Sequence, residues 1–354
     1  MNVPPADRFA GVLLGTAVGD AIGLPRENLS ARRAARMFGP PPLRHRLIFG
    51  RGLCSDDTEH ACMTAQALVR SGGDADAFLR SLAWKLRWWV LGLPAGVGFA
   101  TLRACIKLWL GVSPRRSGVR SAGNGPAMRA AVIGVAFGDD SARLAELIER
   151  STSLTHRDPR AYAGALAVAL AAHHGATGGP TGVEASKFLE QVEAAAGDAE
   201  IVGLVRRAAT FMAEGRSIAE YAELLGARGG VSGYINQTVP VALFAWLRWP
   251  GDFRRAVEEV IALGGDTDTT GAIVGALVGA TAGAAAIPRE WLDGLIEWPR
   301  NKTWMRELAT RLATTAGGGR AAPVRLFWPA VLLRNVLFAV IVLAHGFRRL
   351  LPPY

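Results

Sequence analysis

Apolar residues recur at helical spacing along most of this 354-residue chain, and this periodicity restricts its fold more than any other feature. Alternating Val, Ile and Thr residues bounded by turns are nearly absent. The pattern therefore predicts an all-α protein. The expected helices cover residues 7–22, 56–71, 75–91, 96–110, 124–137, 141–151, 158–174, 183–196, 199–213, 216–225, 234–248, 251–263, 268–284 and 302–314, with loops at 175–182 and 315–323.

The composition limits the class of partner. Half of the residues are hydrophobic, which is enough for a large buried core. The formal net charge of +10 could indicate nucleic-acid or membrane binding, but the arginines are spread along the chain and form no recognisable reading motif. We read them as a solvated surface and expect no nucleic-acid partner.

The few cysteines and histidines indicate a reducing environment without a soft-metal site. The three cysteines form no C-x-x-C pair and leave an odd count, which argues against a disulfide framework. Adjacent His173 and His174 would diverge by about 100° on a helix, so they are a poor zinc pair. The early apolar stretch "FAGVLLGTAVG" lies between Asp7 and Asp20 without a basic leader, so we expect a cytoplasmic protein.

Two further apolar segments are unusual. Residues 326–346, "LFWPAVLLRNVLFAVIVLAHG", are long enough to cross a bilayer but contain Pro329, Arg334 and Asn335. A central arginine costs about 3 kcal/mol on insertion scales, and a dozen apolar residues returning about 0.3–0.6 kcal/mol each could offset it. Three readings stay open: a span, a terminal helix packed on the core, or an interfacial helix with Arg348 and Arg349 at lipid headgroups.

The division of the chain follows from this tail. Residues 1–315 are expected to form the main domain, and 316–354 a linker with the apolar C-terminal helical tail. The other unusual segment, 84–110, is rich in tryptophan. Trp84 and Trp88 lie one helical turn apart, and an aromatic stripe at that spacing is expected to face the core.

Two acidic clusters stand at the start of apolar helices. In "ALGGDTDTTGAIVGALVGA" (262–280), Asp266 and Asp268 precede a run of small apolar residues. One such residue would satisfy helix capping, and two exceed that need. The second cluster, "SDDTEH" (55–60), holds consecutive Asp56 and Asp57 before another apolar run. Capping and ligation can coexist in both places.

If the two clusters meet, they select a hard metal ion. Four carboxylates at close range would repel by roughly 4 kcal/mol per pair at an effective dielectric near 20. Carboxylate and hydroxyl oxygens suit Mg²⁺ or Mn²⁺ better than zinc. An Asp-Asp and an Asp-x-Asp motif together suit two ions about 3.5–4 Å apart.

An ordered series of motifs resembles the ADP-ribosylglycohydrolases, over about residues 8–313. The motifs are "GTAVGDAIGLPRE" (15–27), "SDDTEHACMTAQAL" (55–68), "SAGNGPAMRAAVIG" (121–134), "LTHRDPRAYAGA" (154–165), "GYINQTVPVALFAW" (233–246) and the 262–280 stretch. Each motif is weak alone, and six in order are a strong signal. The resemblance implies a compact multi-helix fold with two Mg²⁺ or Mn²⁺ ions that releases ADP-ribose from an ADP-ribosylated protein or a related conjugate.

The resemblance also assigns residues. The implied metal ligands are Ser55, Asp56, Asp57, Asp266, Asp268 and Thr269. Proton transfer is assigned to Glu27 and to metal-bound Asp57, since members differ over which of the two is the main acid/base. Substrate contacts are assigned to Gly123, Asn124, Gly125, Met128, His156 and Tyr234, the "GNGPAM" turn being a possible anion site. Without the resemblance, Glu27 would be interpreted as a solvated side chain and residues 123–125 as an ordinary Gly-rich turn. His156 would be interpreted as a surface histidine and Tyr234 as a core residue.

Some features depart from the family pattern. Gln237 stands where many members carry an acid, and the segment between Trp84 and Leu110 holds more tryptophan and arginine than the usual family pattern. The apolar tail is not part of the common fold. Two rival functions stay open: a catalytically inactive ADP-ribose-binding module, and a metal-dependent hydrolase of phosphoesters or small glycosides. The sequence names neither the acceptor, which could be arginine, serine or a non-protein conjugate, nor the oligomeric state.

Overall fold

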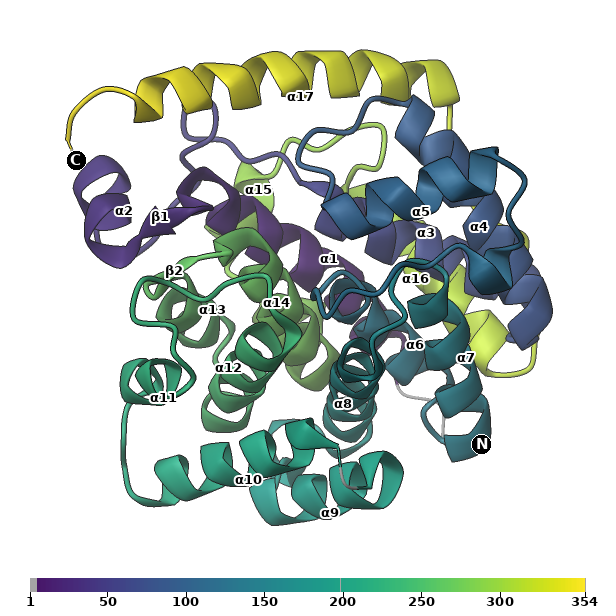
Figure 1. Cartoon of the computed structure of the whole chain (residues 1–354), viewed down its shortest axis with the longest axis horizontal. Coiled ribbons are helices and arrows are strands. Elements are labelled where there is room, and N and C mark those ends of the chain that lie inside the picture. Colours follow the sequence, from purple (N-terminus) through teal and green to yellow (C-terminus); the bar gives the residue numbers. More distant parts are fainter. Residues whose placement is uncertain (1–4, 198, 354) are drawn as a thin grey trace.

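The computed structural model describes residues 5–197 and 199–353, and the prediction of an all-α protein is confirmed (Figure 1). The helices are Ala6–Gly23 (α1), Ala31–Phe38 (α2), Asp56–Ser71 (α3), Ala75–Leu91 (α4), Phe99–Trp109 (α5), Ala130–Phe137 (α6), Ser141–Ser153 (α7), Pro159–Gly178 (α8), Ala185–Ala196 (α9), Glu200–Ala213 (α10), Ile218–Leu224 (α11), Ile235–Arg248 (α12), Phe253–Ile261 (α13), Thr267–Ala282 (α14), Arg289–Gly294 (α15), Lys302–Ala316 (α16) and Trp328–Arg349 (α17). Two short antiparallel strands, Leu29–Ser30 (β1) and Gly264–Gly265 (β2), pair Leu29 with Gly265.

Short or glycine-rich elements account for the differences from the predicted helices. Helices α2 and α15 were not predicted, because α2 is strongly polar and α15 has only six residues. The helix expected at 124–137 begins as a 3-10 turn at Ala127–Arg129, and α6 follows it. The loop expected at 175–182 begins later than predicted, because α8 runs to Gly178.

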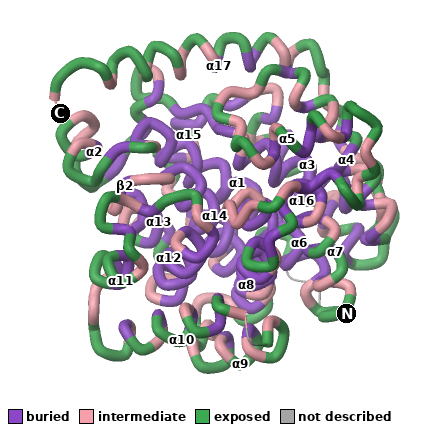
Figure 2. Tube along the Cα trace, viewed as in Figure 1, coloured by how far each residue is buried: buried purple, intermediate pink, exposed green. Residues whose placement is uncertain are grey.

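Helices α1 and α14 form the centre of the molecule and touch backbone to backbone (Figure 2). A Cβ atom added to Gly15 would lie 2.1 Å from the carbonyl oxygen of Gly275, and one added to Gly275 would lie 2.2 Å from that of Gly15. Gly19 meets Gly271 in the same way. Small residues allow this close approach. The pairing is antiparallel, so the C-terminal end of α1 lies beside the first turn of α14.

The remaining helices surround this pair. Helices α3, α6, α8, α12, α13 and α16 pack around α1 and α14. Helices α9 and α10 lie along one edge of the molecule, and α17 crosses the opposite edge (Figure 1).

The expectation that Trp84 and Trp88 face the core is wrong. Trp84 is 58% exposed and Trp88 is 40% exposed, and Trp88 packs edge-on against both Trp84 and exposed Trp109. A different stripe of α4 is buried, comprising Phe78, Leu79, Leu82, Ala83, Leu86 and Trp89. The tryptophans therefore form an exposed aromatic cluster.

The apolar tail forms α17, which is packed on the rest of the chain. Among the described helices it alone is long and apolar enough to cross a membrane, by length and composition. Arg334 and Asn335 lie on its inner face: Arg334 forms a 2.6 Å ion pair with Glu297, and Asn335 donates to the carbonyl of Gly92 at 2.8 Å. The outer face of α17 is exposed along its length (Figure 2).

Candidate functional site

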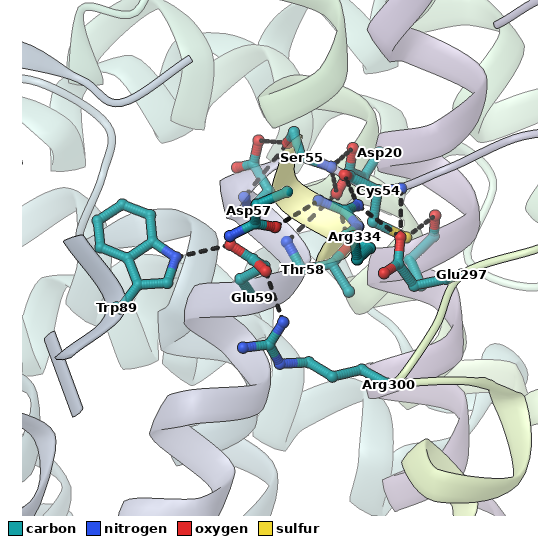
Figure 3. A network of polar contacts seen from close by, with 12 residues as sticks. Asp20, Cys54, Ser55, Asp57, Thr58, Glu59, Trp89, Glu297, Arg300 and Arg334 are labelled. Carbon is teal, nitrogen blue, oxygen red and sulfur yellow. Dashed lines mark hydrogen bonds and ion pairs between the residues drawn. The ribbon is translucent and has the colours of Figure 1, made fainter. Parts of the chain in front are cut away.

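The first acidic cluster lies in the first turn of α3, where Ser55 is the N-cap residue. The Ser55 hydroxyl donates to Asp57 Oδ2 at 3.0 Å. From α1, Asp20 accepts hydrogen bonds from the Ser55 amide at 2.9 Å and from the Thr58 hydroxyl at 2.5 Å (Figure 3). Because Asp20 accepts hydrogen bonds from N–H groups at the start of α3, the side chains of Asp56 and Asp57 are not needed to cap this helix.

The second acidic cluster lies at the start of α14. Asp266 is its N-cap residue, but its side chain makes no capping hydrogen bond. Asp266 Oδ2 instead accepts a 2.7 Å hydrogen bond from the Asn124 amide. Capping therefore does not explain Asp266. Asp268 follows in the first turn of α14 and is 5% exposed.

The two clusters meet in space although more than 200 positions separate them in the sequence. The Thr269 hydroxyl donates to Asp57 Oδ2 at 3.1 Å. Asp57 Oδ2 therefore accepts hydrogen bonds from two hydroxyl groups, those of Ser55 and Thr269. The other oxygen, Asp57 Oδ1, is buried and has no hydrogen-bond partner among the described residues, and the same is true of Asp268 Oδ1.

Crowding of carboxylates in a buried place controls their ionisation. Burial is the main cause that raises the pKa of Asp57, followed by the charges of Asp56, Asp20 and Asp266. Burial, then Glu27, Asp266 and Asp57, likewise raises the pKa of Asp268. The pKa of Asp20 rises to about 7 because of its burial. The folded chain thus holds a cluster of acids that favours bound protons or cations.

The donor set suits a hard divalent cation. Buried carboxylate oxygens without hydrogen-bond donors, beside the two hydroxyls, are the atoms that Mg²⁺ and Mn²⁺ prefer. Among the described residues, no three His, Cys, Asp or Glu side chains are already gathered around one point as a metal would gather them. The side chains are thus not arranged around a common point, but their oxygen donors and the unpaired carboxylate oxygens are of the kind that such ions bind.

A cavity of about 680 Å³ opens beside the acidic clusters. Ten of the predicted site residues line it: Glu27, Asp56, Gly123, Asn124, Gly125, Met128, His156, Asp266, Asp268 and Thr269. Ser55 and Asp57 lie behind them, in contact through the Thr269 hydrogen bond. The volume of the cavity is within the range of about 300–1,000 Å³ that is typical of small-molecule sites.

Glu27 lies in the turn after α1, half-buried at the wall of this cavity. Burial raises its pKa, and the nearby charge of Asp266 raises it further. The Asn28 amide donates to Glu27 Oε1 at 2.9 Å. The turn is also held from α17, because Arg349 donates to the carbonyl oxygens of Glu27 and Pro25 at 2.9 and 3.0 Å.

The glycine turn at 123–125 runs across the ring of His156. A Cβ atom at Gly123 would lie 3.1 Å from His156 Nε2, and one at Gly125 would lie 3.0 Å from Cε1, so side chains there would crowd the ring. Burial and the charge of Arg129 lower the pKa of His156 to about 3, and its imidazole is neutral. The Ala127 and Met128 amides donate to the Asn124 carbonyl, so they are less available to an anion than expected.

Tyr234 does not line the cavity. Its hydroxyl accepts from Arg160 at 3.1 Å, while its backbone pairs with Gly123. Tyr234 therefore supports the glycine turn from behind.

Several residues that the sequence did not predict hold the site. Asp20 belongs to the 15–27 motif, and an aspartate inside a small-residue helix is itself a signal of a buried polar contact. Glu59 accepts from Trp89 at 2.6 Å and from Arg300 at 2.5 Å, one turn after Asp56 (Figure 3). Arg129 is fully buried and donates to Ser151, Thr155 and His60. Only tertiary packing reveals such supporting partners.

Comparisons with known proteins show the family to which the chain belongs. The sequence model of the ADP-ribosylglycohydrolase family matches residues 1–322. An uncharacterized protein of Archaeoglobus fulgidus is 30% identical, covering 86% of this chain and 96% of its own. The ADP-ribosyl-[dinitrogen reductase] glycohydrolase of Rhodospirillum rubrum is 28% identical, covering 82% of this chain and 90% of its own.

A solved structure gives the same result. A chain of an ADP-ribosylglycohydrolase-related protein complex is 29% identical and superposes with a TM-score of 0.66, covering 88% of this chain and 98% of that one. The family resemblance of the sequence motifs is thereby confirmed. This chain belongs to the ADP-ribosylglycohydrolase family.

Proposed function

We propose that this protein is a dinuclear Mg²⁺- or Mn²⁺-dependent hydrolase that cleaves the C1'' N- or O-glycosidic bond of an ADP-ribosylated protein or related conjugate and releases ADP-ribose. The observation that carries the proposal is the Thr269 to Asp57 hydrogen bond, which joins the two acidic motifs beside a cavity. Membership of a family of glycosidic hydrolases supports the same reaction class.

Six residues would hold the ions: Ser55, Asp56, Asp57, Asp266, Asp268 and Thr269. When bound, the ions would orient the ribose hydroxyls and supply an activated water. Asn124 fixes the Asp266 carboxylate by its 2.7 Å hydrogen bond, and the Ser55 and Thr269 hydroxyls fix Asp57. Positioned ligands of this kind make the site rigid before substrate arrives.

Glu27 is the proposed proton carrier, with Asp57 as the second acid assigned to proton transfer. Its raised pKa allows Glu27 to hold a proton nearer neutral pH than a solvated glutamate does. The turn at Gly123, Asn124 and Gly125 and the neutral ring of His156 would receive the ADP-ribose without adding a positive charge. Met128 adds apolar contact at the cavity wall.

A linkage panel tests the reaction. Purified protein would be given arginine-linked and serine-linked ADP-ribosyl peptides, small O-linked conjugates and phosphoesters, each with Mg²⁺, Mn²⁺ or chelator. We expect metal-dependent ADP-ribose release that Asp57→Ala and Asp268→Ala abolish. ADP-ribose binding without hydrolysis of any linkage would instead identify the inactive binding module, and turnover restricted to phosphoesters would contradict the proposed reaction.

We also propose that this cytoplasmic protein contacts anionic membrane surfaces through residues 326–346 without spanning them. Arg334 and Asn335 face inward and are paired, so the polar groups that oppose insertion are already buried in protein. The outer face of α17 exposes Leu333, Val336, Leu337, Val340, Leu343 and Phe347. Such a face lies in the plane of the interface.

Charge supports an anionic lipid surface as the partner. The loop at 44–51 contacts α17 through Leu47 and Phe338, which share one apolar cluster. Phe49 is fully exposed at its tip, with exposed Arg44, Arg46 and Arg51 around it. Arginines beside apolar groups favour acidic headgroups by about 1 kcal/mol each.

Vesicle sedimentation tests this contact. The full chain should sediment with phosphatidylglycerol-containing vesicles, less so at high salt, and should stay in solution with neutral phosphatidylcholine vesicles. Leu337→Glu with Val340→Glu should abolish sedimentation without changing the melting temperature. Equal sedimentation of this variant, or extraction only by detergent, would refute an in-plane contact.

A further inference from the structure

The tryptophan-rich segment and the tail meet around a second cavity. Its lining residues have no role in the proposed hydrolysis. This cavity holds about 320 Å³ and lies between α3, α4, α16 and the start of α17. Its lining is mainly apolar and aromatic, with Met63, Trp84, Trp88, Trp89, Trp304 and Trp328. The family model matches residues 1–322, so the part of this lining that the tail contributes, including Trp328, lies outside the matched residues.

A basic cavity adjoins the aromatic one. It holds about 540 Å³ and is lined by Arg70, Ala77, Arg80, Ser81, Trp84 and Lys85. Trp84 and Lys85 line both cavities, so the two cavities share a wall. Three cations and no acid face the basic cavity within the described part of the chain.

Lys85 is the side chain that most needs a partner here. Burial, followed by the charges of Arg70 and Arg300, lowers the pKa of Lys85 to about 8. Arg300 donates to Glu59, which also accepts a hydrogen bond from Trp89. The Ser81 hydroxyl oxygen, in the same lining, is buried without a hydrogen-bond partner among the described residues.

A cluster of cations without anions beside an apolar cavity is complementary to a molecule with both properties. We propose that the two cavities form one binding site for an anionic amphiphile, that is, a carboxylate or phosphate headgroup on an aliphatic chain. The headgroup would lie among Arg70, Arg80, Ser81 and Lys85, and the chain would lie among the tryptophans. An anionic headgroup gains charge-assisted hydrogen bonds there, and the chain gains burial.

The site adjoins α17 and the ion pair that Arg300 forms with the first turn of α3. Trp328 and Val331 of α17 line it, so a bound chain would pack against the tail. Arg300 lines it as well and pairs with Glu59 in the first turn of α3. We therefore expect occupancy to raise the thermal stability of the protein, whether or not the chain hydrolyses ADP-ribosyl bonds.

Binding to monomeric amphiphiles tests the proposal directly. The full chain would be titrated by calorimetry and tryptophan fluorescence with dodecanoate and dodecyl phosphate below their critical micelle concentrations. Dodecanol supplies the chain without charge, and acetate or inorganic phosphate supplies the charge without a chain. We expect saturable one-to-one binding of both charged amphiphiles, a higher melting temperature, and binding at least tenfold weaker for each partial probe.

Variants locate the site. Lys85→Met keeps the apolar stem and should weaken dodecanoate binding about tenfold, the effect of one charge-assisted hydrogen bond. Lys187→Met removes an exposed lysine on α9 and should leave the affinity unchanged. Trp88→Ala should weaken binding and reduce the fluorescence change, since Trp84, Trp89, Trp304 and Trp328 still line the cavity.

Several outcomes would overturn the site. Dodecanol binding as tightly as dodecanoate, saturation by phosphate alone, or full affinity in a Lys85→Met variant with unchanged melting temperature would each do so. Binding to anionic vesicles without binding of monomeric amphiphile would assign the surface to membrane contact instead. Because the readout is binding, failure of the proposed hydrolysis would not affect this result.

Discussion

Asn124 connects the predicted substrate turn to the predicted metal ligands. Its amide donates to Asp266 Oδ2 at 2.7 Å and to Thr238 Oγ1 at 3.1 Å. Loss of a partner that orients a metal ligand typically costs 10–100-fold in metal affinity. We expect Asn124→Ala to raise the Mg²⁺ or Mn²⁺ concentration for half-maximal activity by about 10–100-fold.

The control for Asn124 is Ser121→Ala, because Ser121 also lines the cavity and its hydroxyl accepts from the Gly123 amide instead of binding an acidic side chain in the described part of the chain. Activity titrated against metal concentration should separate the two variants. An Asn124→Ala variant with unchanged metal dependence and a weaker apparent substrate affinity would assign Asn124 to the substrate alone.

At the scale of single residues, the motif residues that the sequence assigned to the site lie close together in the structure. Asp56, Asp57, Asp266 and Asp268 belong to motifs, and packing brings their helices together. Asp20, Glu59 and Arg129 support the same site through contacts between distant segments. A sequence pattern reports local periodicity, so partners fixed only by tertiary packing could not be predicted.

At the scale of elements, the backbone contact between α1 and α14 fixes where the acids meet. We expect Gly275→Ala to destabilise the protein and to reduce activity, because its new Cβ would lie 2.2 Å from the carbonyl oxygen of Gly15. Overpacking of this kind costs about 1–3 kcal/mol or more. Urea unfolding and the hydrolysis assay measure the two effects.

Gly203→Ala is the matched control, because nothing lies within 4 Å of a Cβ atom at this position in α10. The same exchange should stabilise the protein by about 0.5–1 kcal/mol through helix propensity. If both variants behaved alike, the close contact of α1 and α14 would not be the reason for the glycines.

A buried ion pair is one of the contacts that hold helix α17 on the domain. Arg334 donates to Glu297 at 2.6 Å and to the Cys54 carbonyl at 2.5 Å, next to Ser55. Removing one partner leaves a buried charge unpaired and costs about 3–5 kcal/mol. Arg334→Met should therefore destabilise the protein by that amount in urea unfolding.

The double variant Arg334→Met with Glu297→Gln removes both charges and should recover most of the stability. Equal losses in the single and double variants would mean that packing of the long side chain, and not the ion pair, holds α17.

At the scale of the whole molecule, the helical class and most helix positions followed from apolar periodicity. The orientation of the amphipathic elements did not. The tail and α4 each carry two apolar faces, so periodicity could not choose which one the core would cover. The buried face of α17 is the one that carries Arg334 and Asn335, because Glu297 and the Gly92 carbonyl bind these two side chains. Trp84 and Trp88 are exposed because other residues of α4 face the interior.

The acidic cluster should make the whole fold less stable without metal than with it. The folded protein raises the pKa values of Asp57 and Asp268, so it binds more protons than the unfolded chain above about pH 4. The free energy of unfolding of metal-free protein should therefore fall as pH rises from about 4, through the Asp20 pKa of about 7. Asp57→Asn removes one charge and should be more stable than wild type in chelator, by a margin that is larger at pH 8 than at pH 5.

Divalent metal should reverse that order. A ligand at 100 times its dissociation constant stabilises the folded state by about 2.7 kcal/mol. Wild type should gain about this much from saturating Mg²⁺ or Mn²⁺, whereas Asp57→Asn should gain little. Thermal unfolding of both proteins, with chelator and with each metal, measures the crossover. A wild type that is more stable than Asp57→Asn in chelator at pH 8 would show that the carboxylates do not repel one another across the site, and the physical reason for placing metal there would be lost.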